Sequence, residues 1–195
     1  VFMVDDGYSV PGQSFSFGEG IKGGIAGSEL TFITQIRNEA GLNRPAGGVE
    51  LSAGMALLSG NLDVTVETMD MNDGTYRSFF KTNFAGDYQL SVKIASDHIQ
   101  GSPFEVSILP DKTSALSSSV FTLSSLVSVV SETVTFKIIS RDKFFNEQKY
   151  DEYAGPDPYV VKLEMAGEAA TFFGSVQNNK DGTYQVSYTT TRAGA

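Results

Sequence analysis

The sequence predicts an all-β protein made of two related sandwich domains in tandem. Three observations predict it: apolar and polar residues alternate with a period of two, a phrase recurs about one hundred residues later, and no segment shows sustained helical periodicity. Glycine, phenylalanine, valine, threonine and serine are abundant, which favours strands joined by turns. A hydrophobic fraction of 41% is sufficient for buried cores.

The strands of the first domain follow from the alternation. Residues 88–94 and 104–108 carry apolar side chains at every second position, and so do residues 30–36 apart from Thr34. Further strands are expected at about 48–53 and 62–68, and a strand that begins after the turn at residue 74 directs Tyr76 and Phe80 to one face. Alternation of this kind gives one buried and one solvated face, as in an antiparallel sandwich.

The repeated phrase is Asp-Gly-Thr-Tyr, followed in both copies by Ala-Gly. It begins at Asp73 and again at Asp181, an offset of 181 − 73 = 108 residues. Further upstream, the segment that starts at Thr31 pairs with the one that starts at Thr135, an offset of 135 − 31 = 104. A period of this length indicates a repeated domain rather than a solenoid repeat, with a small insertion in the second copy.

The Asp-Gly pairs Asp73-Gly74 and Asp181-Gly182 are expected to reverse the chain between two strands, because glycine supplies the positive φ of a tight turn. The tyrosines that follow, Tyr76 and Tyr184, are then expected to point into the core of each domain.

Further signature residues lie at the next corners of the first domain. Gly86 marks a corner, and Tyr88 just beyond it resembles the tyrosine corner of immunoglobulin-like sandwiches, in which the hydroxyl bonds back to the backbone. Pro103 is tolerable because it begins a strand that continues with Phe104, rather than interrupting one.

Charge and composition argue against several classes of function. With 14 basic and 23 acidic residues the net charge is −9, which would repel nucleic-acid phosphates. The chain has no Cys, so neither disulfides nor thiolate metal sites are expected, and no cofactor is implied. Residues 113–131 carry no charge, but eight of them are Ser, so two strands explain the stretch better than a membrane span.

Catalysis finds little support in the sequence. The single histidine, His98, is expected in a loop before the last strand of the first domain, and a general base would need an aligned partner. The stretch after Asp70 resembles a calcium loop only superficially, because glycine comes one position early and Lys81 stands where the bidentate Glu belongs. We therefore expect a chain that is not an enzyme.

Three segments, 73–76, 85–88 and 98–104, resemble the filamin-type immunoglobulin repeat, which carries Asp-Gly-Thr-Tyr, Ala-Gly-x-Tyr and His-Ile-x-Gly-Ser-Pro-Phe in this order. The resemblance implies tandem immunoglobulin-like β-sandwiches. It assigns residues 1–13 to the last strand of a preceding repeat plus a linker, residues 14–110 to one repeat, and residues 111–195 to a second repeat lacking its last two strands. The short segment 110–114 is expected to be a semi-rigid linker.

The resemblance also implies a function. Filamin-type arrays act as rod-like spacers and as docking platforms, and an extended partner segment typically adds alongside strand C, in the groove between strands C and D. The corresponding residues here are Gly48, Val49, Glu50, Leu51, Ser52, Leu62, Asp63, Val64, Thr65 and Val66. In the second copy they fall at about 159–165 and 170–177. The plainer interpretation is that these are ordinary edges kept inert by charges such as Glu50, Asp63, Lys162 and Glu164.

The expected partners are proteins: extended peptide segments, neighbouring repeats and cytoskeletal filaments. The leading hypothesis is therefore an intracellular structural segment associated with the cytoskeleton, that of cilia included. The alternative is an extracellular adhesion module, since some cell-surface proteins carry similar repeats. A third possibility is a β-sandwich domain that binds carbohydrate for an attached enzyme. Such a domain needs exposed aromatic side chains, and the absence of Trp from this chain argues against it.

Overall fold

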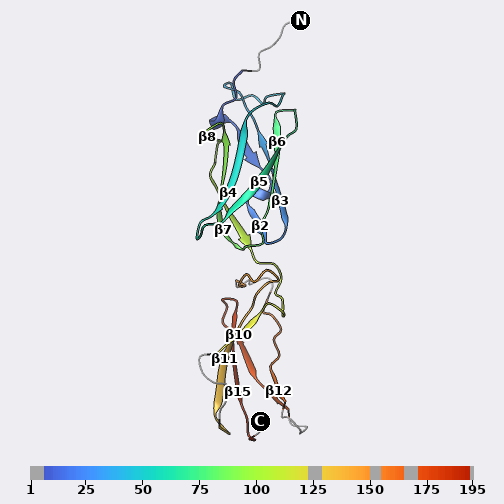
Figure 1. Cartoon of the computed structure of the whole chain (residues 1–195), viewed down its shortest axis with the longest axis vertical. Helices are drawn as coiled ribbons and strands as arrows, with labels where there is room; N and C mark the ends of the chain where they lie inside the picture. Colours follow the sequence, from blue (N-terminus) through green and yellow to red (C-terminus); the bar gives the residue numbers. More distant parts are fainter. Residues whose placement is uncertain (1–6, 123–128, 150–154, 165–170, 194–195) are drawn as a thin grey trace. The chain divides into compact units, whose positions relative to one another are not determined.

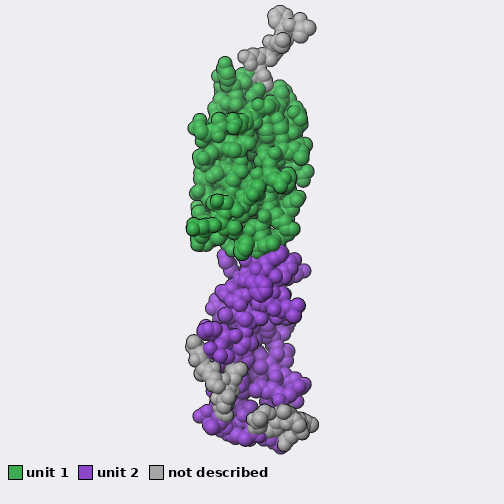
Figure 2. All heavy atoms as spheres, viewed as in Figure 1, with its two compact units in different colours: residues 1–109 green, residues 110–195 purple. Residues whose placement is uncertain are grey.

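The computed structural model describes residues 7–122, 129–149, 155–164 and 171–193 (Figure 1). The chain forms two compact units, Val1–Leu109 and Pro110–Ala195, drawn in green and purple in Figure 2. Within the described residues the regular structure is β apart from the short 3-10 turns η1 (Pro11–Gln13) and η2 (Glu19–Ile21), which confirms the predicted fold class. No helix among these residues is long and apolar enough to cross a bilayer.

Unit 1 is a curled antiparallel sandwich with two faces. On the first face four strands lie side by side in the order β1 (Phe15–Phe17), β3 (Glu29–Gln35), β6 (Thr75–Lys81) and β5 (Asp63–Asp70). On the second face the order is β4 (Leu51–Leu57), β7 (Gly86–Ile94), β9 (Phe104–Leu109) and β2 (Gly23–Ile25), where β2 runs parallel to β9. The two-residue strand β8 (Asp97–His98) pairs with the end of β7.

The core of unit 1 lies between the two faces, and the predicted alternation is confirmed there. Every second side chain of β7 is buried, from Tyr88 to Ile94, and so are Val106 and Ile108 of β9. On the opposite face Phe32 and Ile36 are buried, and so are Tyr76 and Phe80 of β6. Burial of these large side chains, each stabilising by about 1.5–3 kcal/mol, holds the two faces together.

Strand β5 belongs to both faces. From Asp70 to Val66 it pairs with β6, the last pair being Val66 with Phe80. From Thr65 to Asp63 it pairs instead with β4, beginning at Gly54. The strand therefore crosses from one face to the other between Val66 and Thr65, and it has a neighbour on only one side at each end (Figure 1).

Unit 2 is also β. Its described strands form a sheet in the order β10 (Ser119–Phe121), β11 (Thr133–Ile139), β15 (Thr183–Thr189) and β14 (Ser175–Asn178), and a separate pair of β12 (Lys162–Glu164) with β13 (Thr171–Phe173). Ile138, Tyr184 and Val186 are buried at its centre, and Tyr159 packs edge-on to Tyr184 at a ring distance of 4.9 Å. Of residues 1–13, expected to hold the last strand of a preceding repeat plus a linker, residues 1–6 lie outside the described residues.

The two units repeat the same backbone contacts. The amide of Val10 bonds to the carbonyl of Arg37 at 2.9 Å, and the amide of Ser114 bonds to the carbonyl of Arg141 at 2.7 Å. The offsets are 114 − 10 = 104 and 141 − 37 = 104, equal to the offset between the matched sequence segments.

The segment 110–114, expected to be a linker, is held on unit 2. The Asp111 amide donates to the carboxylate of Asp142 at 2.9 Å, and the Asp111 carboxylate forms a 2.8 Å ion pair with Lys143. Gln148 donates to the Asp111 carbonyl at 2.6 Å. The physical reason is Asp142, a fully buried carboxylate that needs hydrogen-bond donors around it.

A candidate docking edge on strand β4

The Asp-Gly turns are built as the sequence predicts. In unit 1 Gly74 has a φ of 83°, and the carboxylate of Asp73 accepts hydrogen bonds from the amide and hydroxyl of Thr75 at 2.9 and 2.6 Å. In unit 2 Gly182 has a φ of 84°, and Asp181 binds Thr183 at the same two distances. The hydroxyl hydrogen bond from the threonine lowers the pKa of each aspartate below its ordinary value.

Each of these glycines is required for a second reason, which the sequence alone does not reveal. A Cβ on Gly74 would lie 1.8 Å from the carbonyl oxygen of Arg44, and one on Gly182 would lie 1.9 Å from that of Gln148. The loop after strand β3, or after β11 in unit 2, therefore packs directly against the turn. This contact places the start of the next strand, β4 in unit 1, beside the hairpin of β5 and β6.

Tyr76 then fixes where β4 begins. Its hydroxyl accepts a hydrogen bond from the Val49 amide at 2.7 Å and donates to the carboxylate of Asp70 at 3.2 Å. Burial raises the pKa of Tyr76, so the phenol stays protonated and able to donate. Tyr184 repeats the arrangement with the amide of Asp157 at 2.7 Å. Both tyrosines are buried, as predicted.

Asp70 holds the same corner from the other side. Its carboxylate accepts hydrogen bonds from the amides of Gly48 at 2.7 Å and Asn72 at 2.8 Å. The bond from Gly48, followed by that from Asn72, lowers the pKa of Asp70. From the sequence, Asp70 stands out only as part of the rejected calcium loop, and this role is not predicted. No sequence pattern predicts the hydrogen bond between Asp70 and Gly48, because the two residues lie 22 positions apart in the chain.

The free edge of β4 is short and well defined. Residues Leu51–Ala53 pair with β7 on one side, whereas β5 reaches β4 only from Gly54 onward. The Ala95 amide donates to the Glu50 carbonyl, and the Leu57 amide donates to the Leu62 carbonyl on the β5 side. Because backbone bonds of an antiparallel strand alternate between its two sides, the amides and carbonyls of Leu51 and Ala53 point to the open side.

The structure separates the predicted docking residues into three groups. The amides of Gly48 and Val49 and the carbonyl of Glu50 already have partners, and these residues precede the strand, which begins three positions later than predicted. Leu51 and Ser52 lie on the free part of the strand. The D-strand residues are occupied by neighbouring strands: Leu62, Asp63, Val64 and Thr65 face β4, and Val66 faces β6.

The strand runs on past its predicted end at Ala53 through residues 54–57, although the next residue is Gly54. The glycine is an ordinary member of the strand, paired with Ser91 and Thr65, with open space where a Cβ would be. In unit 2 the corresponding region is β12 with β13, and the predicted residues 165 and 170 lie outside the described residues.

The other signature residues lie at corners and strand ends of unit 1, with Gly86 at the start of β7 and Phe104 at the start of β9. Tyr88 is fully buried and its hydroxyl donates to the carbonyl of Phe84 at 2.8 Å, the backbone bond expected of a tyrosine corner. Pro103 directly precedes β9. His98, expected in a loop, lies instead in the two-residue strand β8, where it is exposed and its Nδ1 is 2.8 Å from the Ser102 hydroxyl. Among the described residues no group of three or more His, Asp or Glu side chains is placed to hold a metal ion.

Comparison with known proteins adds three findings. The family model described as the Filamin/ABP280 repeat matches residues 8–105. Mouse Filamin-C is 26% identical over 211 aligned positions, covering 96% of this chain and 7% of that protein, and human tripartite motif-containing protein 2 is 26% identical over 101 positions, covering 52% and 13%. The solved structure of invasin, titled a bacterial integrin-binding protein, superposes with a TM-score of 0.62 at 17% identity, over 96% of this chain and 36% of that one. The chain thus spans a small part of the length of these relatives.

Proposed function

Because the chain belongs to the Filamin/ABP280 repeat family, whose repeats are structural and protein-interaction modules, we propose that it is a scaffold segment that docks partner proteins by strand addition. The partner is an extended peptide segment that pairs with β4 at Leu51–Ala53. The scaffold is proposed to be cytoskeletal, by analogy with the match to mouse Filamin-C.

The observation that carries the proposal is the unequal pairing of β4. One half of this strand has neighbours on both sides, and the other half, Leu51–Ala53, has β7 alone. An extended peptide placed there would satisfy the outward groups of Leu51 and Ala53 and would extend the second face by one strand. The bonds that Tyr76 and Asp70 make to Val49 and Gly48 support the proposal, because they hold the edge in place before a partner arrives.

Residue-resolved amide hydrogen exchange tests the register directly. The probe is a peptide selected from a random display library against the purified chain. Binding is expected to protect the amides of Leu51 and Ala53, while Ser52 between them changes little because it already pairs with β7. Tight binding with unchanged exchange at Leu51 and Ala53 would contradict strand addition at this edge.

Ala53→Pro removes the outward amide without disturbing the bonds to β7, and proline is tolerated on an open strand edge. We expect this variant to keep its thermal midpoint within a few degrees and to lose at least about tenfold in peptide affinity, the effect of one lost backbone hydrogen bond plus steric exclusion. Ala53→Ser keeps the amide and serves as the matched control, with affinity unchanged.

The second candidate function is an adhesion module at the cell surface. It is favoured by the superposition on invasin, whose structure is titled a bacterial integrin-binding protein. Labelling of intact cells with a membrane-impermeant reagent distinguishes the two functions. If the protein is a cytoskeletal scaffold, it should remain unlabelled and should co-sediment with cytoskeletal filaments. If it is an adhesion module, it should be labelled and should not co-sediment with the filaments.

A further inference from the structure

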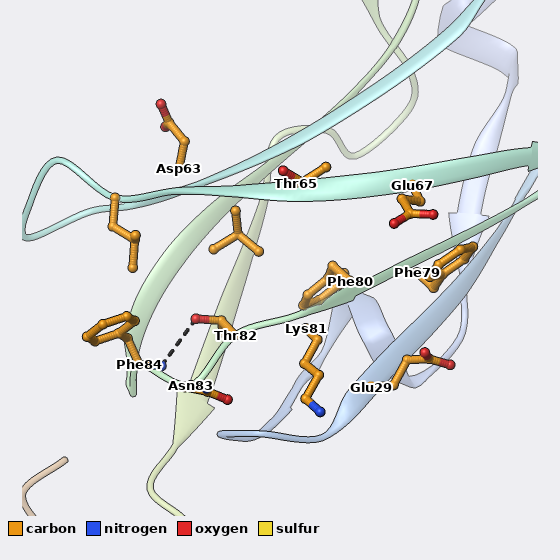
Figure 3. Close-up of a pocket in the computed structure, with 12 residues that line it drawn as sticks. Glu29, Asp63, Thr65, Glu67, Phe79, Phe80, Lys81, Thr82, Asn83 and Phe84 are labelled. Atoms are coloured by element: carbon orange, nitrogen blue, oxygen red, sulfur yellow. Dashed lines mark hydrogen bonds between the residues drawn. The ribbon is translucent and has the colours of Figure 1, made fainter. Parts of the chain in front are cut away.

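The crossing of β5 leaves a second gap, on the β6 side. Below the pair formed by Val66 and Phe80, strand β5 turns away toward β4, while β6 continues to Lys81 and on to the corner at Phe84. A hollow of about 450 Å³ lies between them (Figure 3). This volume is enough for two or three side chains of a bound segment.

The floor of the hollow is apolar. Val64 of the diverging strand β5, Leu62 just before it and Phe80 of β6 line it, with Phe84 at one end (Figure 3). Phe84 is 56% exposed although its own backbone is anchored, its carbonyl by Tyr88 and its amide by the Thr82 hydroxyl. A large aromatic side chain that is held in an exposed position beside an apolar floor is available to cover an inserted apolar group.

The rim of the hollow is acidic. Glu29, Asp63 and Glu67 line it against one basic residue, Lys81, a net of −3 + 1 = −2. All four side chains are exposed, and among the described residues none of these three carboxylates forms an ion pair. Figure 3 shows Glu67 and Glu29 near Phe79 at the end of the hollow away from Phe84. A guanidinium placed there would meet carboxylates and the face of a ring together.

We infer that this hollow is a second docking site, for a partner segment that carries an apolar side chain beside an arginine or lysine. The apolar group enters between Val64 and Phe84, and the cation reaches Glu67 and Glu29. The site is separate from the edge of β4, because it lies on the β6 side of β5 and uses side chains rather than a strand edge. It holds whether or not strand addition at β4 occurs.

The charge pattern predicts opposite effects for two substitutions. The probe is the capped tripeptide Leu-Gly-Arg, with Leu-Gly-Glu as its acidic counterpart, titrated into the whole isotope-labelled chain and followed by amide chemical shifts. Shifts are expected at Thr65, Glu67, Lys81 and Phe84 with Leu-Gly-Arg alone. Glu67→Gln should weaken binding about threefold, because it removes a carboxylate, whereas Lys81→Gln should strengthen it, because it removes a competing cation.

Controls separate this site from the rest of the surface. Glu105→Gln changes an exposed carboxylate of β9 outside the hollow and should leave the affinity unchanged. Phe84→Ser should abolish binding while native amide shifts elsewhere persist. Ala53→Pro should leave tripeptide binding intact, so failure of this site and failure of strand addition are distinguishable.

Four outcomes would overturn the inference: no shifts up to the solubility limit of the peptide, equal binding of Leu-Gly-Glu, shifts centred on Leu51–Ala53, or no effect of Glu67→Gln. Sedimentation of the chain at rising concentration adds a fifth. Self-association that is lost in Phe84→Ser would show that a second copy of the chain, rather than a basic partner segment, covers the hollow.

Discussion

Gly48 and Gly74 have almost the same backbone conformation, with φ values of 84° and 83°, but different surroundings. Nothing lies within 4 Å of a Cβ built on Gly48, whereas one on Gly74 would lie 1.8 Å from the Arg44 carbonyl oxygen. The pair separates the cost of a strained φ from the cost of a steric overlap.

Gly48→Ala is expected to cost about 1 kcal/mol in the free energy of unfolding of unit 1, the penalty of a left-handed conformation. Gly74→Ala is expected to cost about 3 kcal/mol or more, because the loop that contains Arg44 must also move. Amide hydrogen exchange in the core of unit 1 measures both. Equal losses for the two variants would show that the turn yields without strain.

Tyr76→Phe tests the hydrogen bond that fixes the start of β4. Loss of the hydroxyl leaves the Val49 amide and the Asp70 carboxylate short of one partner each, so unit 1 should lose about 1–2 kcal/mol and the Val49 amide should exchange faster. Tyr184→Phe should produce the same loss in unit 2. The matched control is Tyr8→Phe. Because Tyr8 is 83% exposed, the loss of its hydroxyl should leave the free energy of unfolding unchanged.

At the scale of elements, the loops after β3 and β11 carry different residues at one equivalent position, Asn38 and Asp142, and this difference has a large consequence. Asn38 in the first loop accepts bonds from the amides of Ala40 and Leu42. Asp142 in the second accepts equivalent bonds from Phe144 and Asn146, and its other oxygen takes the Asp111 amide. The carboxylate thereby ties the segment after Leu109 to unit 2.

Asp142→Asn keeps one acceptor oxygen but replaces the other by a donor that faces the Asp111 amide. We expect unit 2 to lose about 1–3 kcal/mol and the Asp111 and Ser114 amides to exchange faster, while unit 1 is unaffected. The reciprocal change, Asn38→Asp, should be nearly neutral because that site is more exposed. A neutral Asp142→Asn would mean that the other contacts of the segment, such as those with Gln148 and Lys143, are sufficient to hold it.

Much of the element structure could be predicted from sequence, for a physical reason. Alternation reports which face of a strand is buried, so Tyr88 to Ile94 and Val106 to Ile108 were placed correctly. The Asp-Gly turns were equally readable, because positive φ limits the choice of residue. The crossing of β5 could not be predicted from the sequence. The same side chains of β5 are buried whether the strand pairs with β4 or with β6, so the alternation does not say which pairing occurs, and only the register of the ladders does. The extent of the free edge on β4 depends on that register, so it too had to come from the structure.

For the whole molecule, acid is the expected destabilising condition. The pKa values of Asp70, Asp73, Asp111 and Asp181 all lie below the ordinary 3.8, each through hydrogen bonds to the carboxylate. A carboxyl whose folded-state pKa is depressed contributes stability above its unfolded pKa and loses it as pH falls through the folded value.

The stability of both units should therefore be flat from about pH 7 to pH 5 and fall below about pH 4. Urea unfolding followed by circular dichroism across this range measures it. Asp73→Asn should make the acid-induced loss smaller in unit 1. Asp97→Asn, at an exposed carboxylate that accepts no hydrogen bond from a described residue, should leave the profile unchanged. Stability that rises on acidification would contradict the assignment.

The passage of β5 from one face to the other gives the two proposed sites a common wall. A residue of β5 that pairs with β4 cannot also pair with β6. If the crossing point moves so that the free edge of β4 becomes longer, the hollow beside β6 becomes smaller, and the reverse also holds. A ligand at either place therefore discourages a ligand at the other, and linkage requires the two penalties to be equal. Unit 1 would then act as a selector between a strand-forming partner and a basic one, with the crossing point of a single strand as the variable that decides.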